Sequence, residues 1–106
     1  MSIIPGTTPT MTFQLDASIL GCTAAEFCLV CGALQIVRTK QELAVSENGM
    51  EVSVRLSQSE TLLLPDHQIA KVQLRVLLGG TVLATDVIPI ATRELLHRKE
   101  LCADGA

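Results

Sequence analysis

The chain has 106 residues, which is the size of one domain; 48% of them are hydrophobic and 18% are charged. This composition excludes intrinsic disorder, because disordered chains are poor in apolar residues and rich in charge. The net charge of −3 argues against binding to nucleic acid or to an anionic membrane surface. The absence of Trp and Tyr also removes the aromatic side chains on which single-stranded nucleic acid stacks.

The N-terminus, MSIIPGTTPT, has no basic region and no long apolar run, so a signal peptide is not predicted. No apolar stretch approaches the roughly 20 residues that a membrane-spanning helix needs. We therefore expect the protein to fold in the cytoplasm, where thiols stay reduced.

Alternating apolar and polar residues predict the first strands. Residues 11–15 alternate strictly, which places the apolar side chains on one face of a strand. Residues 16–21 form a turn-like connector with room for one helical turn. Residues 24–31 are apolar on both faces apart from Glu26, which predicts a strand that is central in its sheet or covered on both sides.

A third strand begins near Leu34 and Ile36. We expect Arg38 and Lys40 to turn to solvent from this strand. Residues 42–46 are expected to continue it across a bulge.

The clearest local signal is Glu47-Asn48-Gly49. Asn-Gly tolerates positive φ at both central positions of a type I′ turn, whose twist matches that of the flanking strands. Residues 50–56 then alternate between apolar and polar side chains. We therefore predict an antiparallel hairpin with a type I′ turn.

A short helical crossover follows the hairpin. Ser57 and Glu60 have the spacing of a capping box, in which each side chain accepts from the backbone N–H of the other. Pro65 ends the segment, so the crossover is limited to a short α-helix or a 3₁₀ turn between two sheets.

The second half of the chain returns to strands. Residues 71–78 alternate, and Gly79-Gly80 predicts a second hairpin turn. Residues 82–90 are expected to form the last long strand, with Pro89 indicating an edge position because proline has no N–H to donate. The charged segment at residues 92–101 is compatible with either a helix or a strand extension.

About six or seven short strands separated by turns predict an all-β fold, an immunoglobulin-like two-sheet β-sandwich of antiparallel strands with one short helical crossover. The Trp and the tyrosine corner of antibody domains are absent. We divide the chain into an extended N-terminal arm at residues 1–9, a β-sandwich domain at residues 10–92 and a charged C-terminal tail at residues 93–106.

The four cysteines are the candidate metal-binding or redox residues: Cys22, Cys28, Cys31 and Cys102. Cys28 and Cys31 form a CxxC motif, but side chains three positions apart on a strand point to opposite faces. Their Cα atoms would be about 10 Å apart, against a limit of ~7 Å for a disulfide. The second close pair of a typical zinc site is missing. A small intracellular cysteine-dependent metal-binding or redox-linked protein is the alternative function.

The remaining polar residues do not form a catalytic set. His67 and His97 lack metal-binding spacing, and the serines lack a GxSxG context. Structural roles account for the other charged candidates, which are Glu47, Glu51, Glu60, Arg38, Arg55 and Arg75. We predict that the protein is not an enzyme and has no catalytic, cofactor-binding or metal-binding residue, and no cofactor.

Three leucine runs, at residues 62–64, 77–78 and 95–96, contain side chains that cannot all face one core. One interpretation is full burial in a compact sandwich. The other is an interface, because large exposed apolar patches mark contacts with other proteins. The second interpretation predicts a homo-oligomer or an assembly with other proteins.

The order of these signals resembles a known group of proteins. Residues 5–10 run into the strand at 11–15, the capping segment at 56–62 follows the Asn-Gly hairpin, and the segments at 72–77 and 83–86 come next. This order resembles small prophage-encoded proteins of gut Firmicutes and is similar to the N-terminal β-sandwich domain of phage upper-baseplate proteins.

The resemblance covers most of residues 5–90 and rests on structural motifs. It implies a non-enzymatic structural or assembly module, prophage-derived and associated with a tail or baseplate. The implied partners are further copies of the chain, phage structural proteins, or both. The implied locations are the cytoplasm before assembly and the virion after it.

Overall fold

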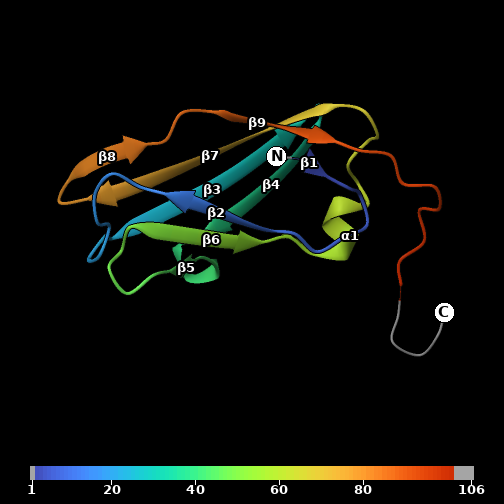
Figure 1. Ribbon diagram of the computed structural model, residues 1–106. Helices are drawn as coiled ribbons and strands as arrows, with labels where there is room; N and C mark the ends of the chain where they lie inside the picture. The colour runs from blue at the N-terminus through green and yellow to red at the C-terminus, as the bar shows by residue number, and fades with distance from the viewer. Residues whose placement is uncertain (1, 102–106) are drawn as a thin grey trace.

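Two β-sheets pack face to face in the computed structural model, which describes residues 2–101 (Figure 1). The strands are β1 (Ser2–Ile3), β2 (Thr10–Gln14), β3 (Ala24–Cys31), β4 (Leu34–Thr39), β5 (Ala44–Val45), β6 (Glu51–Arg55), β7 (Ile69–Leu78), β8 (Thr81–Ala84) and β9 (Ile88–Thr92). The helical elements are η1 (Lys40–Glu42), a 3₁₀ turn, and α1 (Gln58–Thr61).

Sheet A, the upper layer in Figure 1, has the strand order β1-β9-β7-β3-β4, and β8 pairs with the part of β7 that β9 leaves free. Sheet B, the lower layer, has the order β2-β6-β5. All pairs are antiparallel except β1 with β9, which is parallel. The predicted all-β fold with two mainly antiparallel sheets is confirmed.

The core lies between the two sheets. The alternation predicted for β2, β6 and β7 is confirmed, because every second side chain of these strands is buried apart from Leu78, which is partly buried at the end of β7. Phe13 of β2 and Phe27 of β3 meet edge to face across the sheets, with ring centroids 6.0 Å apart. The rest of the core is almost entirely aliphatic, as the composition predicts.

Both predicted hairpins form, but the type I′ turn predicted at Asn48-Gly49 is wrong. Gly49 has a φ of +73°, whereas Asn48 does not have a positive φ. The Gly49 N–H donates to the Ser46 carbonyl at 2.9 Å, as in a type I turn followed by a left-handed glycine. At the second hairpin both Gly79 and Gly80 have positive φ, which a type I′ turn requires.

The last strand is broken in two, which corrects the single strand expected at residues 82–90. The Leu74 N–H donates to the Thr85 hydroxyl at 3.1 Å instead of to a backbone carbonyl. The ladder is therefore interrupted between β8 and β9. This break, together with the short strands β1 and β5, gives nine strands in the described residues rather than six or seven.

Residues 42–46, expected to continue the third strand, instead end η1 and cross to sheet B as β5. The connector at residues 16–21 contains no helical turn. The capping box of α1 is confirmed, since Ser57 and Glu60 each accept the backbone N–H of the other.

The N-terminal segment is part of the sandwich rather than a free arm. Ser2 and Ile3 pair with β9, and Ile3 is only 2% exposed. The buried Thr61 hydroxyl accepts the Gly6 N–H at 3.0 Å and donates to the Thr7 carbonyl at 2.7 Å. Apolar burial and these hydrogen bonds offset the entropy that a free arm would keep.

Residues 93–101 form neither a helix nor a strand and run beside α1 (Figure 1). Arg98 donates to the carbonyls of Leu62 and Leu64, both at 2.9 Å, and forms an ion pair with Asp66. Among residues 2–101 no helix is long and apolar enough to cross a membrane.

Candidate partner-binding site

A cleft of about 630 Å³ opens between β2 of sheet B and the β8–β9 link of sheet A. The lining is mainly apolar and comes from both sheets: Met11, Phe13, Leu15, Ile19, Val72, Leu74, Val76, Leu83, Ile88 and Ile90. Most of these side chains belong to the core, but Leu83 and Ile88 are 46% and 39% exposed. The cleft is therefore a place where the apolar interior reaches the surface.

Strand β2 forms one wall of this cleft and is an edge of sheet B. Its five residues, TMTFQ, include no charge and no proline. Natural edge strands are commonly protected by charges, prolines, bulges or very short length. By these criteria the edge of β2 is unprotected, whereas β5 at the other edge has only two residues.

Two carboxylates are among the residues that line the cleft. Asp16 follows the C-terminal end of β2, and Asp86 lies in the opposite wall, in the link between β8 and β9. They are the only charged residues among those lining the cleft, and neither belongs to an ion pair formed within residues 2–101. The cleft is thus mainly apolar, with one carboxylate in each wall.

No family model, no curated protein and no solved structure matches this chain.

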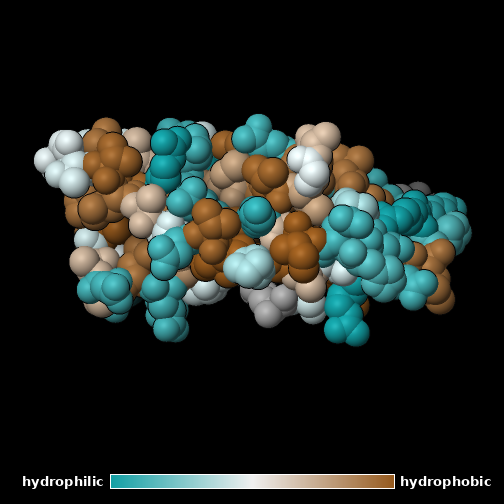
Figure 2. Space-filling model, turned by 90° about the horizontal axis from the view of Figure 1, so that it is seen from above, coloured by the Kyte–Doolittle hydropathy of each residue, from teal (hydrophilic) through white to brown (hydrophobic). Residues whose placement is uncertain are grey.

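The outer face of sheet A also carries exposed apolar residues. Figure 2, seen from the side on which sheet A lies in Figure 1, shows hydrophobic and hydrophilic groups interleaved. The strand register explains this pattern: the Arg75–Glu26 ion pair, at 3.0 Å, lies next to the row formed by Leu77 and Val82. Because charges interrupt this face, it is a weaker candidate for a docking surface than the cleft.

The leucine runs are divided between the core and the surface. Leu64 is fully buried, whereas its neighbour Leu63 is 66% exposed. Leu77 and Leu78 are partly buried, and Leu96 in the C-terminal segment is 92% exposed. None of the runs forms a wall of the cleft.

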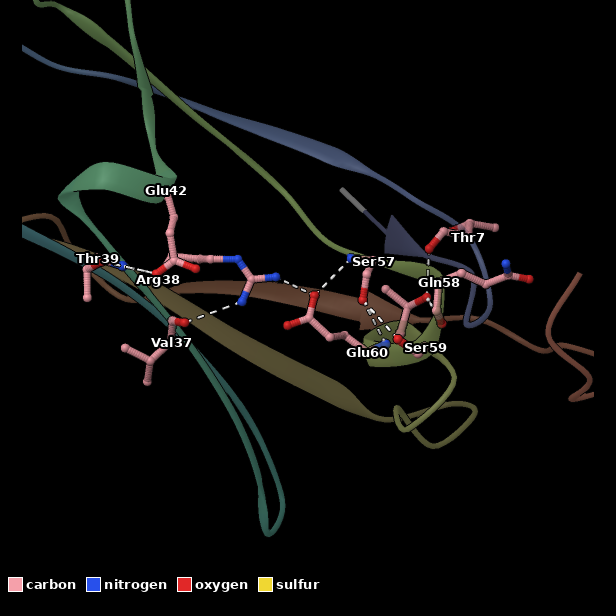
Figure 3. Close-up of polar contacts among 10 residues, drawn as sticks. Thr7, Val37, Arg38, Thr39, Glu42, Ser57, Gln58, Ser59 and Glu60 are labelled. Carbon is pink, nitrogen blue, oxygen red and sulfur yellow. Dashed lines mark hydrogen bonds and ion pairs between the residues drawn. The ribbon is translucent and has the colours of Figure 1, made fainter. Parts of the chain in front are cut away.

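A polar cluster links β4 to α1 on the side of the molecule shown in Figure 3. Arg38 forms an ion pair with Glu60, whose carboxylate also accepts the Ser57 N–H at 2.9 Å. The hydrogen bond from Arg38 is the main reason that the pKa of Glu60 falls to about 2, despite partial burial that acts in the opposite direction. The same hydrogen bond raises the pKa of Arg38.

This position corrects the expectation that Arg38 faces solvent. Arg38 lies on the same face of β4 as the buried Ile36, and its side chain is only 16% exposed. Arg38 and Glu60 neutralise each other, and Glu60 also accepts the N–H at the start of α1. The cluster therefore joins β4 to α1 and leaves neither charge free to bind a ligand.

The cysteines lie as the strand argument predicts. Cys31 is buried in the core, and Cys28 points to the opposite face of β3, where its sulfur accepts from Gln35 Nε2 at 3.6 Å. Cys22 is also buried in the core, and Cys102 is outside the described residues. Within residues 2–101 no three His, Cys, Asp or Glu side chains are placed to hold a metal ion. No contact among them favours the cysteine-dependent alternative.

The other candidates are dispersed and have structural contacts. The His67 N–H donates to the Thr92 carbonyl at 3.1 Å, and His97 lies in the exposed C-terminal segment. Arg55 donates to the Thr8 hydroxyl at 3.4 Å. The serines at 46, 53 and 57 bond to nearby turn, strand or helix-cap groups.

The pattern of residues along the chain does not predict the cleft. Its walls come from segments about 70 residues apart in the chain, and only the packing of the two sheets brings them together. One local signal points to it: the strand at 10–14 has neither a charge nor a proline, which is the mark of an unprotected edge.

Proposed function

We propose that the protein is a non-enzymatic β-sandwich module that assembles with other structural proteins, as the resemblance to prophage tail and baseplate proteins implies. The observation that carries this proposal is the unprotected edge of β2 beside an apolar cleft. Such an edge is a ready site for pairing with another chain.

The strand order supports an immunoglobulin-like assignment of the sandwich. Strands β9-β7-β3 take the places of the G, F and C strands in such folds, and β2-β6-β5 take those of B, E and D. Strand β4 then corresponds to the additional strand of the variable type. Immunoglobulin-like modules serve many unrelated functions, so this assignment supports the scaffold and leaves the function to its surfaces.

The test is capture of the tagged chain from its host after prophage induction, with quantification of the tail and baseplate proteins recovered. The parent is compared with Leu83→Lys/Ile88→Lys in the cleft and with Val30→Lys/Val37→Lys on the outer face of sheet A. All four side chains are at least 39% exposed, so both double variants are expected to fold.

We expect the parent and the outer-face variant to enrich tail or baseplate proteins, and the cleft variant to lose them. Recovery of the bait alone by the parent would overturn the assembly function. If only the outer-face variant loses these proteins, the contact lies on the outer face of sheet A and not in the cleft. Circular dichroism of both purified variants controls for folding.

A further inference from the structure

We propose that the cleft accepts an extended segment of a partner protein, which adds to β2 as an antiparallel strand. This segment has apolar side chains at alternate positions and a lysine or arginine at its N-terminal end. The inference rests on the proposed assembly function and specifies the chemistry of the partner.

The direction of the backbone groups makes strand addition available. The Leu15 N–H donates to the Met50 carbonyl, and the Leu56 N–H donates to the Pro9 carbonyl. Antiparallel strands alternate between residues that bond to one neighbour and residues that face away. The odd-numbered residues of β2 therefore bond to β6, and the backbone groups of Thr10, Thr12 and Gln14 face the open side.

The two faces of an added strand would meet different surroundings. On the inner side it would cover Leu83 and Ile88, which the fold leaves partly exposed across the cleft from β2. On the outer side it would continue the polar row formed by Thr12 and Ser53, whose hydroxyl oxygens lie 2.9 Å apart. Since side chains of a strand alternate between its faces, the partner needs an apolar residue at every second position.

The negative charge of the cleft gives a second property of the partner. An antiparallel strand runs opposite to β2, so its N-terminal end lies beside Asp16, which follows β2, while Asp86 lies farther along the opposite wall. These two carboxylates face no cation among the residues that line the cleft. A basic side chain at this end of the partner complements Asp16, and Asp86 adds to the negative charge of the cleft. Charge complementarity of this kind favours one orientation and one register.

A second copy of this chain fits the cleft less well. Pairing of β2 with β2 would bring the segment TMTFQ to the edge, and this segment has no basic residue. Its apolar side chains, Met11 and Phe13, already pack into their own core at 3% and 7% exposure. They are unable to cover the cleft of a neighbour as well, so the occupant is a different protein.

The first experiment is a titration of the purified chain with synthetic peptides. The probe is acetyl-Lys-Val-Thr-Val-Thr-Val-Thr-amide. One control has Glu in place of Lys, and another has the same composition with the three Val residues adjacent. We expect the Glu peptide to bind about tenfold more weakly and the non-alternating peptide to lose binding. Equal affinity of all three peptides, or no binding of the first, would overturn the proposal.

Variants of the protein identify the site. Thr12→Pro removes a backbone N–H that faces the open side, so it blocks strand addition while leaving the bonds to β6 in place. Thr12→Val is the matched control, because it also loses the hydroxyl bond to Ser53 but keeps the N–H. We expect loss of peptide binding in Thr12→Pro and less than a threefold change in Thr12→Val, by analogy with other exposed positions.

The double variant Asp16→Asn/Asp86→Asn keeps the backbone edge intact and removes the two charges. We expect it to bind the Lys and Glu peptides with equal affinity, and a retained preference for Lys would overturn the charge assignment. This variant also provides the test if Thr12→Pro does not fold.

The outcomes separate this proposal from the assembly function. If tail or baseplate proteins are captured equally by the parent and by Thr12→Pro, the result supports the assembly function and contradicts strand addition to β2. If the purified chain forms a dimer that Thr12→Pro abolishes, the occupant is a second copy and the proposal is overturned.

Discussion

Arg38 on β4 and Glu60 in α1 form an ion pair that joins an edge strand of sheet A to the crossover between the sheets. The carboxylate is fixed from two sides, because it also caps the helix at Ser57. One local sequence signal, the capping box, thus determines where a distant arginine is neutralised.

This pair predicts a loss of stability in acid. The folded-state pKa of Glu60 is about 2, below the usual value of 4.5, so the unfolded chain binds the proton more tightly. The stabilisation is therefore complete above about pH 4.5 and is lost as the pH falls toward 2. We expect a contribution of about 1 to 2 kcal/mol to the free energy of unfolding, since the partly solvated pair is screened.

Urea unfolding of the parent and of Glu60→Gln at a series of pH values tests this prediction. Glutamine keeps an oxygen that caps Ser57 but has no charge, so the variant isolates the ion pair. The difference in stability between the two proteins should shrink from pH 6 to about pH 2. A difference that is independent of pH would assign the effect to packing instead.

Gly49 combines two constraints that an alanine would violate. Its φ is +73°, and an added Cβ would lie 2.3 Å from Ser18 Oγ and 2.9 Å from the backbone nitrogen of Leu20. We expect Gly49→Ala to lower the free energy of unfolding by about 2 to 4 kcal/mol, from backbone strain and overpacking together.

Gly80 is the matched control for this substitution. It has a φ of +82° but no atom within 4 Å of an added Cβ, so Gly80→Ala carries the backbone strain alone. We expect a loss of about 1 kcal/mol there. Equal losses at both positions, measured by urea unfolding, would mean that the contact with Ser18 and Leu20 relaxes freely.

These two glycines also illustrate what the sequence predicts and what it leaves open. Hairpins at both positions are predicted because local alternation and glycine suffice to indicate them. The turn types are not: at Gly49 the neighbouring Asn48 bonds through its side chain to the Ser46 hydroxyl and the Met50 N–H, and it does not adopt a positive φ. Two consecutive residues with positive φ, as a type I′ turn requires, occur at Gly79-Gly80 instead.

Contacts between distant segments account for the other positions at which the structure differs from what the sequence predicts. The sequence predicts that Arg38 faces solvent, because Glu60, the partner that allows its partial burial, comes 22 residues later in the chain. The N-terminal residues look like an arm because β9, with which they pair, is at the other end of the chain. The walls of the cleft are β2 and the link between β8 and β9, which come together only when the two sheets pack.

Thr61 fixes the N-terminal segment through a fully buried hydroxyl. Thr61→Val keeps the shape of the side chain but leaves the Gly6 N–H and the Thr7 carbonyl without this partner. We expect a loss of about 1 to 3 kcal/mol in the free energy of unfolding. Thr61→Ser, which restores the hydroxyl and removes a methyl group, should lose only about 1 kcal/mol.

Amide hydrogen exchange distinguishes anchoring from general packing. If Thr61 anchors this segment, the Gly6 amide should exchange faster in Thr61→Val than in Thr61→Ser, while amides of β3 change less. Equal protection of Gly6 in both variants would contradict the anchoring role.

The cysteines allow a direct test of the strand geometry. In a Cys102→Ser background three thiols remain: Cys22 and Cys31, which are buried, and Cys28, which is partly exposed. We expect a maleimide to label Cys28 in the native protein and all three thiols only after unfolding, because access controls the rate of thiol modification. A mild oxidant should not join Cys28 to Cys31, since the two side chains lie on opposite faces of β3. Detection of that disulfide in the folded protein by peptide mapping would contradict the strand assignment and return the CxxC motif to the list of redox candidates.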